Sequence, residues 1–166
     1  MSAPPPEVTT LRLRLPLVTL DERADMLAGR RRPEWHPDYP RDDDRDAVSM
    51  IRKAGPDGWG PRHIVRAFDG VVVGTIGFYG PPEETRGLPE TEIGYGLVQD
   101  ARGHGAATEA LRGMLLETDR LGVRVRAGVR PDNAASLRVL ATCGFTELRG
   151  TDEEGHLVMG RPLPVA

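Results

Sequence analysis

The chain has 166 residues, a formal net charge of -3 at neutral pH and a sequence pI near 5.8. This length suits one domain that buries a core without disulfides, and the acidic balance gives no reason to expect a nucleic-acid partner. Cys143 is the only cysteine, so no intrachain disulfide can form and a reducing compartment is expected. No run approaches the about 20 apolar residues that a membrane helix needs, and the start does not resemble a signal peptide. We therefore expect a cytoplasmic protein without membrane contact.

The N-terminal part begins with a proline-rich segment. Residues 1–9 include three consecutive prolines, and because proline supplies no backbone donor we expect a disordered lead-in there, followed by a single domain over 10–163. Alternating leucine and arginine after Thr10 predicts a half-buried strand. Asp21 is then expected to cap a short helix that ends near Gly29.

An irregular segment follows that helix. Residues 30–40 contain three prolines and two aromatic side chains, which excludes an ordinary helix or a central strand. Trp35 and Tyr39 are expected to pack onto the core as anchors of a surface loop. Asp42–Asp44 and Asp46 then open a helix, where acidic residues suit the positive end of the helix dipole. An alternative role for these carboxylates is an acidic patch that steers a cationic amine.

The middle of the chain reads as paired strands. Asp69-Gly70 lies between two β-rich runs and predicts a hairpin. The stretch 80–89 is expected to be a loop, and the apolar run 93–98 predicts a strand. Beyond it apolar residues recur at steps of three and four up to Leu121, which predicts an amphipathic helix.

The connection between that strand and helix is rich in glycine and alanine. Gly103, Gly105, Ala106 and Ala107 let the backbone approach a ligand closely, and the first turn of a helix offers unpaired N–H groups and a positive dipole end. We expect an anion at this connection, most simply a phosphate.

The C-terminal part repeats the alternation of strand and helix. Residues 123–129 predict a strand, and Asn133 can cap a helix that ends at Gly144. Two further strands are expected at 146–149 and 156–159. The order of elements fits an α/β fold, a mixed sheet with helices on both faces.

Several of these features together resemble a known family. Arg102, Gly105 and Ala107 match the pyrophosphate-loop pattern of the GNAT acetyltransferases, and Asn133-x-x-Ser136 follows in family order, leading to a Gly-Phe pair. The resemblance covers 62–162 and is closest to the branch of the ribosomal-protein N-terminal alanine acetyltransferases. It implies an α+β fold whose mixed, mostly antiparallel sheet of about seven strands is flanked by about four helices.

The resemblance also implies acetyl-CoA as the donor. The two central strands would splay apart, backbone groups of one strand would bind the pantetheine arm, and the loop amides would hold the diphosphate with an arginine beside them. His104 is expected to be a solvent-facing loop residue and not a catalyst. The implied cofactor-binding residues are Leu97, Val98, Arg102, Gly103, His104, Gly105, Ala106, Ala107, Thr108, Asn133 and Ser136.

Two residues are implied to be catalytic. Glu92 corresponds to the glutamate proposed as general base in this branch; the alternative is a solvated glutamate at a strand end. Ser136 corresponds to the proposed general acid, and an equal alternative is a helix-turn hydroxyl that binds the cofactor. Leu140 stands where many GNAT proteins carry a tyrosine for the departing thiolate.

The acceptor site is implied to involve Trp35, Tyr39, Glu92 and Gly96. In similar proteins the loop carrying the two aromatic residues lines the acceptor groove, so this role is weighed equally with that of core anchors. Relatives often have tryptophan in place of Gly96, which suggests a wider site here. Tyr95 points to the opposite face of its strand and is expected in the core.

The expected function is therefore transfer of an acetyl group from acetyl-CoA to a primary amine, by direct attack in a ternary complex. The acceptor is a small-molecule amine or a protein N-terminus, and a homodimer is left open. No metal site is expected because the four histidines are scattered singly. A non-catalytic acyl-CoA-binding or sensing module is the alternative. Nucleotide binding is disfavoured because the loop lacks the first glycine of G-x-G-x-x-G and no P-loop lysine follows.

Overall fold

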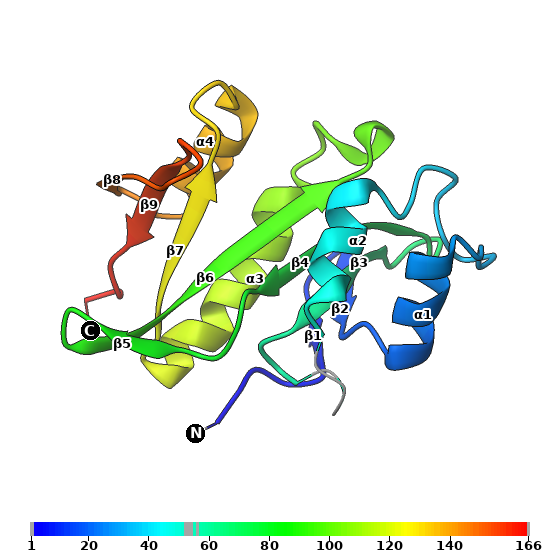
Figure 1. Ribbon diagram of the computed structural model, residues 1–166, viewed down its shortest axis with the longest axis horizontal. Helices are drawn as coiled ribbons and strands as arrows, with labels where there is room; N and C mark the ends of the chain where they lie inside the picture. The colour runs from blue at the N-terminus through cyan, green and yellow to red at the C-terminus, as the bar shows by residue number, and fades with distance from the viewer. Residues whose placement is uncertain (1, 52–54, 56, 166) are drawn as a thin grey trace.

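The computed structural model of the protein describes residues 2–51, 55 and 57–165. One sheet of nine strands runs through it in the order β1-β2-β3-β4-β6-β7-β9-β8, with β5 paired to β6 (Figure 1). This is the expected mixed, mostly antiparallel sheet, with two short strands more than predicted. The strands are β1 (Glu7–Thr9), β2 (Leu13–Pro16), β3 (Pro61–Arg66), β4 (Val72–Phe78), β5 (Glu83–Thr85), β6 (Leu88–Leu97), β7 (Arg124–Val129), β8 (Glu147–Thr151) and β9 (Leu157–Arg161).

The described residues form four α-helices and one 3₁₀ turn. In the view of Figure 1, α2 lies in front of the sheet and α3 crosses behind β6. The α1 helix is capped by Thr19 and not by Asp21, because the Thr19 side chain accepts the N–H of Glu22 in a capping box. The helical elements are α1 (Leu20–Ala28), α2 (Asp42–Ser49), η1 (Gln99–Ala101), α3 (Ala106–Leu121) and α4 (Ala134–Thr142).

The prediction of a disordered lead-in over 1–9 is wrong at its end. Val8 pairs with Leu15 in an antiparallel ladder and is buried. Its apolar side chain lies beside Leu15 against Gly113 of α3, and the prolines do not prevent this pairing because they precede the strand. Leu11 lies in the turn between β1 and β2 and is 93% exposed, so the leucine alternation becomes a buried pattern only from Leu13 onward.

The loop predicted over 80–89 contains a second hairpin. β5 pairs with the start of β6, with Glu83 opposite Glu90. Arg86 and Gly87 have φ of 53° and 81°, and positive φ at both central residues is characteristic of a type I′ turn. Arginine is uncommon in the first of these positions, which is why the turn was not predicted.

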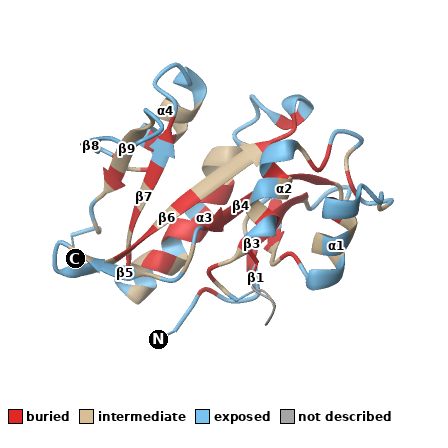
Figure 2. Ribbon diagram, viewed as in Figure 1, coloured by how far each residue is buried: buried red, intermediate tan, exposed pale blue. Residues whose placement is uncertain are grey.

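The core lies between the sheet and its helices, as the buried segments in Figure 2 show. One face of α3 is buried against the sheet, at the positions that the three-to-four spacing predicted. No helix among the described residues is long and apolar enough to cross a membrane. The buried residues of α3 are Ala110, Leu111, Gly113, Met114, Leu115 and Thr118.

The two central strands, β6 and β7, separate along their length. Their parallel ladder has only three pairs, from Glu90 with Arg124 to Glu92 with Arg126. Beyond it β6 pairs with β4 and β7 pairs with β9, and the strands diverge in Figure 1. The backbone groups that β6 turns toward β7 therefore have no ladder partner past Glu92.

Candidate functional site

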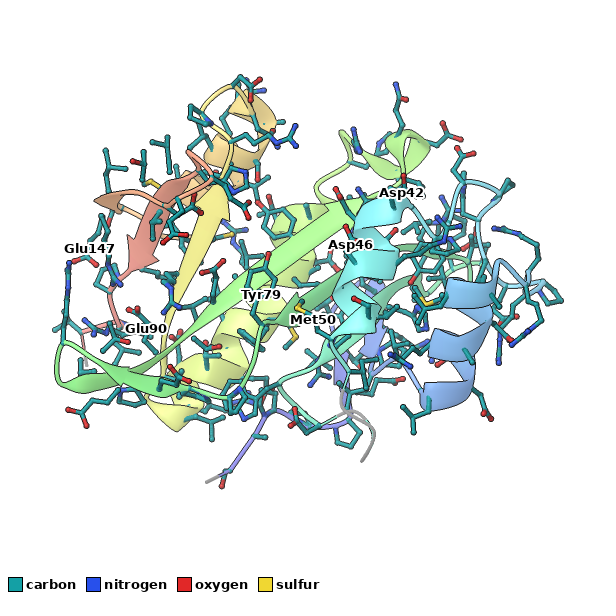
Figure 3. The ribbon with its side chains drawn as sticks, viewed as in Figure 1. Asp42, Asp46, Met50, Tyr79, Glu90 and Glu147 are labelled. Atoms are coloured by element: carbon teal, nitrogen blue, oxygen red, sulfur yellow. The ribbon has the colours of Figure 1, made fainter. Side chains whose placement is uncertain are left out.

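A groove of about 1170 Å³ opens on the α2 side of the sheet. It is bordered by α2, β4, β6 and the turn between β8 and β9. Asp46 and Met50 line it from α2 and the end of that helix, and Tyr79 lines it from the end of β4 (Figure 3). The groove reaches the point where β6 and β7 separate, since Gly94 and Gly128 both border it.

Glu92 lies in this groove, as the sequence predicted. Its Oε1 is 3.3 Å from Nε of Arg126, and its side chain is 27% exposed. Burial raises the pKa of Glu92, and the Arg126 guanidinium opposes that rise only in part. A carboxylate with a raised pKa accepts a proton better near neutral pH, which suits a general base.

Among the charged side chains that line the groove, carboxylates outnumber cations. Carboxylates come from α2, from β6 and from the β8–β9 turn, so they surround the cavity from three elements. Among the lining residues that the structure describes, Asp43, Asp46, Asp57, Glu92, Asp152, Glu153 and Glu154 face two arginines, Arg41 and Arg130, and His156. Such a surface attracts cations and repels anions.

The structure corrects the prediction of a wide site at Gly96. A Cβ on Gly96 would lie 2.2 Å from Nη2 of Arg41, so that guanidinium occupies the space that a larger side chain would need. Arg41 is held there by the buried carboxylate of Asp44 at 2.8 Å, which also accepts the Thr75 hydroxyl at 2.6 Å. Gly96 thus lies beneath Arg41 and does not widen the groove.

Trp35 and Tyr39 are core anchors and do not border the groove. They are 4% and 0% exposed, and their rings meet edge to face. The Tyr39 hydroxyl is 2.7 Å from Nδ1 of buried His63, whose Nε2 is 3.1 Å from the Glu22 carboxylate. This polar network satisfies the tyrosine inside the core, so the acceptor-binding role predicted for the two aromatic residues is wrong.

The loop before α3 has the backbone shape of an anion site. Gly103 and Gly105 have φ of 82° and 79°, a conformation that glycine adopts at no steric cost. Gly105 is the N-cap of α3 and makes no side-chain capping bond, so the amides of the first turn at Ala106, Ala107 and Thr108 point outward without a cap. These features fit a diphosphate.

Arg102 and His104 flank this loop. The Arg102 side chain is tied to β6, because its Nε donates to the Leu97 carbonyl at 3.1 Å. His104 is exposed, as predicted, and its carbonyl accepts Nη2 of Arg12 at 3.0 Å. Arg12 also binds Glu109 in the first turn of α3 at 2.7 Å. The sequence did not reveal Arg12, since it is 92 residues away from the loop.

Leu97 and Val98 differ in what their backbone can offer. The Val98 N–H donates to Val73 at 2.8 Å and its carbonyl accepts the Ala101 N–H at 3.0 Å. The N–H is therefore not free to bind a cofactor, and a role for Val98 in cofactor binding stays a prediction. Adjacent strand residues turn their backbone groups to opposite sides. The N–H of Leu97 therefore faces the gap between β6 and β7.

Asn133 and Ser136 lie at the start of α4. Asn133 caps the helix by accepting the Ser136 N–H at 3.0 Å. The Ser136 Oγ is 2.8 Å from the hydroxyl of Tyr95, which was predicted to be core. Tyr95 is half-buried and borders the groove together with Asn133. Leu140 is buried and 1% exposed.

One group of potential metal ligands occurs among the described residues. Atoms of His36, Asp38 and Asp100 lie within 4.8 Å of one another. The His36 Nδ1 accepts the Asp38 N–H at 3.0 Å, and its Nε2 is 3.3 Å from Asp100. A turn and an ion pair at the surface explain this group, and the absence of a metal site stays a prediction.

Known proteins resemble this chain in sequence and in structure. A family model described as the acetyltransferase (GNAT) domain matches residues 12–146. RimJ from Mycobacterium smegmatis, solved in complex with CoA-disulfide, aligns with a TM-score of 0.67 and 25% identity over 96% of this chain and 89% of that one. An acetyltransferase from Agrobacterium tumefaciens aligns at 0.66 and 19%, over 98% and 97%.

A third structure is named as a ribosomal-protein acetyltransferase. The ribosomal-protein-S5-alanine acetyltransferase from Vibrio fischeri aligns with a TM-score of 0.65 and 14% identity, over 95% of this chain and 96% of that one. No curated protein matches the chain. The family model spans most of the sequence, and the solved structures share the fold. The chain therefore belongs to the GNAT acetyltransferase family, near the branch that includes RimJ.

Proposed function

We propose that the protein transfers an acetyl group from acetyl-CoA to a cationic primary amine, either a small molecule or a protein N-terminus. The observation that carries this proposal is the position of Glu92. Its carboxylate stands in an acidic groove beside the point where β6 and β7 separate, and burial raises its pKa. A base in that position can take the proton that makes an ammonium group unreactive.

Acetyl-CoA, the acetyl donor, would be held by the first turn of α3 and by the edge of β6 that faces β7. The first-turn amides of α3 and the Arg102 guanidinium suit the diphosphate. The N–H of Leu97 faces the gap where an extended arm can take the place of a ladder partner. Acetyl-CoA would supply an activated acyl group as its thioester. The protein would supply position, a base and a proton.

The acceptor class follows from charge. The carboxylates of α2 and of the β8–β9 turn, with few opposing cations among the described lining residues, favour an amine that arrives as an ammonium ion. Once Glu92 has taken its proton, the neutral nitrogen can attack. The same walls disfavour acceptors that carry carboxylates or phosphates.

The Glu92→Gln variant tests this proposal. Glutamine keeps the shape and most hydrogen bonding of Glu92 but cannot take a proton, so we expect transfer to fall at least ~100-fold while binding of coenzyme A survives. Part of the loss should return at higher pH, where more of the amine is already neutral. Release of free thiol measures transfer on a panel of amines, and calorimetry measures binding.

Glu117→Gln is the matched control. Glu117 lies on α3 outside the groove and pairs with Arg120, so its loss should leave transfer unchanged. Full activity of Glu92→Gln on an amine that the wild type acetylates would exclude Glu92 as the base. Tight binding of coenzyme A without turnover on any amine would favour the acyl-CoA-sensing module instead.

A further inference from the structure

The hydroxyl of Tyr95 joins two elements at the point where the sheet opens. Tyr95 lies on β6, and its hydroxyl is 2.8 Å from the Ser136 Oγ on α4. The β6–β7 ladder ends at Glu92, so this contact spans the open part of the gap. Both Tyr95 and Glu92 border the same groove, although they point to opposite faces of β6.

The helix α4 has no tyrosine and presents Ser136 toward Tyr95. Ser136 and Leu140 are four residues apart in α4 and so share one face of the helix. Leu140 is buried and offers no polar group. Tyr95 therefore brings a phenol from the neighbouring strand to the same helix face, one turn before Leu140.

The acidities of the Tyr95 phenol and the Ser136 alcohol indicate which of the two hydroxyls can donate a proton. A phenol has a pKa near 10, close to the about 8.5 of an alkyl thiol, whereas an alcohol is a far weaker acid. Burial raises the pKa of Tyr95, and the hydrogen bond with Ser136 lowers it in part. Tyr95 is thus protonated at neutral pH, and Ser136 favours its ionised form.

We propose that Tyr95 is the proton donor to the departing thiolate and that Ser136 is the positioning residue that orients it. This inference rests on the proposed function. When the carbon–sulfur bond of the thioester breaks, its electron pair stays on sulfur and takes the Tyr95 proton. The Ser136 hydroxyl then donates to the phenolate oxygen, and Tyr95 recovers a proton from solvent.

Four variants test the pair: Tyr95→Phe, Ser136→Ala, the double variant, and Thr118→Val as a control. Tyr95→Phe removes only the hydroxyl, so we expect kcat to fall at least ~10-fold while the affinity for coenzyme A, measured by calorimetry, stays unchanged. Ser136→Ala should lower kcat less. The double variant should be no slower than Tyr95→Phe, because Ser136 acts through the phenol.

Thr118→Val controls for the loss of a hydroxyl from the fold. Thr118 is buried in α3 and donates to Leu115 at 3.1 Å, away from the groove. We expect this variant to keep the kcat of the wild type. A fall in its kcat would mean that loss of any buried hydroxyl slows the enzyme, which would overturn the proposal.

A measurement without turnover gives a second readout. The ring signals of labelled tyrosine, followed by NMR against pH in the unliganded protein, report the ionisation of Tyr95. Ser136→Ala should raise the pKa of Tyr95, since the phenolate loses its donor. Cys143 is the titratable neighbour that acts on Tyr95, and it is the same in both proteins.

The outcomes separate this inference from the proposed function. Wild-type transfer with full kcat in Tyr95→Phe would overturn the donor role and leave the acetyltransferase intact. A Tyr95 pKa that does not move in Ser136→Ala would overturn the positioning role. Losses that multiply in the double variant would show two independent groups and contradict the pair. Absence of transfer in the wild type would contradict the proposed function itself.

Discussion

At the scale of single residues, the buried polar side chains explain most of what the sequence pattern left open. Arg41 fills the space above Gly96 because Asp44 and Thr75 hold it there. Tyr39 turns inward because His63 provides a partner for its phenol inside the core. In each case a buried polar partner decides where a large side chain goes.

Glu22 gives a prediction about stability and pH. Burial opposes its ionisation, but the hydrogen bond and charge of His63, together with hydrogen bonds from Thr19, outweigh burial and lower the pKa of Glu22 from 4.5 to about 2. A carboxylate whose pKa is lowered by folding stabilises the fold at pH values above the pKa of the unfolded state, here 4.5. That contribution is lost as the pH falls toward 2. Glu22→Gln should therefore lower stability at neutral pH by about 1–3 kcal/mol.

Urea unfolding between about pH 7 and about pH 3 measures this effect. The difference in the free energy of unfolding between wild type and Glu22→Gln should become smaller as the pH falls. Asp21→Asn removes an exposed carboxylate one residue earlier in the same first turn, so it controls for the helix dipole. A difference in unfolding free energy that stays constant across the pH range would show that the ionised carboxylate of Glu22 is not what stabilises the contact with His63.

At the scale of elements, α3 combines two functions. Its buried face holds the sheet together, and its N-terminal turn forms the proposed diphosphate site. The helix begins and ends at glycines in the left-handed region, Gly105 with φ 79° and Gly122 with φ 70°. The two ends therefore offer the same backbone conformation with opposite ends of the helix dipole.

These two glycines make a matched pair of variants. Gly105→Asp would put a carboxylate where the diphosphate is proposed to bind, so affinity for coenzyme A should fall at least ~10-fold, or about 1.4 kcal/mol. Nη2 of Arg12 is 3.4 Å from the position of a Cβ on Gly105 and can pair with the new carboxylate. Gly122→Asp carries the same backbone strain at the far end of α3 and should bind normally. Equal affinities by calorimetry in both variants would remove the diphosphate site from this loop.

At the scale of the whole molecule, the two halves of the sheet meet through a ladder of only three residue pairs. Glu90 lies at this junction (Figure 3), with its side chain fully buried. Its carboxylate contacts Arg149 at 2.6 Å, Arg126 at 3.1 Å and Arg124 at 3.6 Å. One buried carboxylate thus holds arginines from β7 and β8 beneath the point where the strands separate.

Glu90→Gln should therefore destabilise the protein strongly. Removing one partner of a buried ion pair costs on the order of 3 kcal/mol, because the remaining charges are left uncompensated. Chemical denaturation measures the loss, and hydrogen exchange should locate it in β7, β8 and β9. Glu147→Gln is the control, since Glu147 also contacts Arg149 but its side chain is 47% exposed. Similar stability in both variants would contradict the role of Glu90.

Much of the architecture follows from local sequence. The Asp69-Gly70 turn, the periodicity of α3 and the glycines at its ends depend on residues close in the chain, which is why they could be predicted. The loop at Gly103 and Gly105 and the strand that carries Glu92 also follow from short-range pattern, whereas the central place of that strand in the sheet was implied by the family resemblance. Local backbone preferences act over a few residues and need no knowledge of the fold.

Other features depend on contacts between residues that are far apart in sequence. The contacts of Arg12 with Glu109, of Arg41 with Gly96 and of Tyr95 with Ser136 span 97, 55 and 41 residues, and no local pattern encodes them. The free side of β6 likewise depends on where β7 stops pairing. By itself the sequence determined the order of elements, the phosphate-type loop and the family. The packing of side chains between elements decided which residues face the groove, because that packing is set by volume and polar partners across the fold.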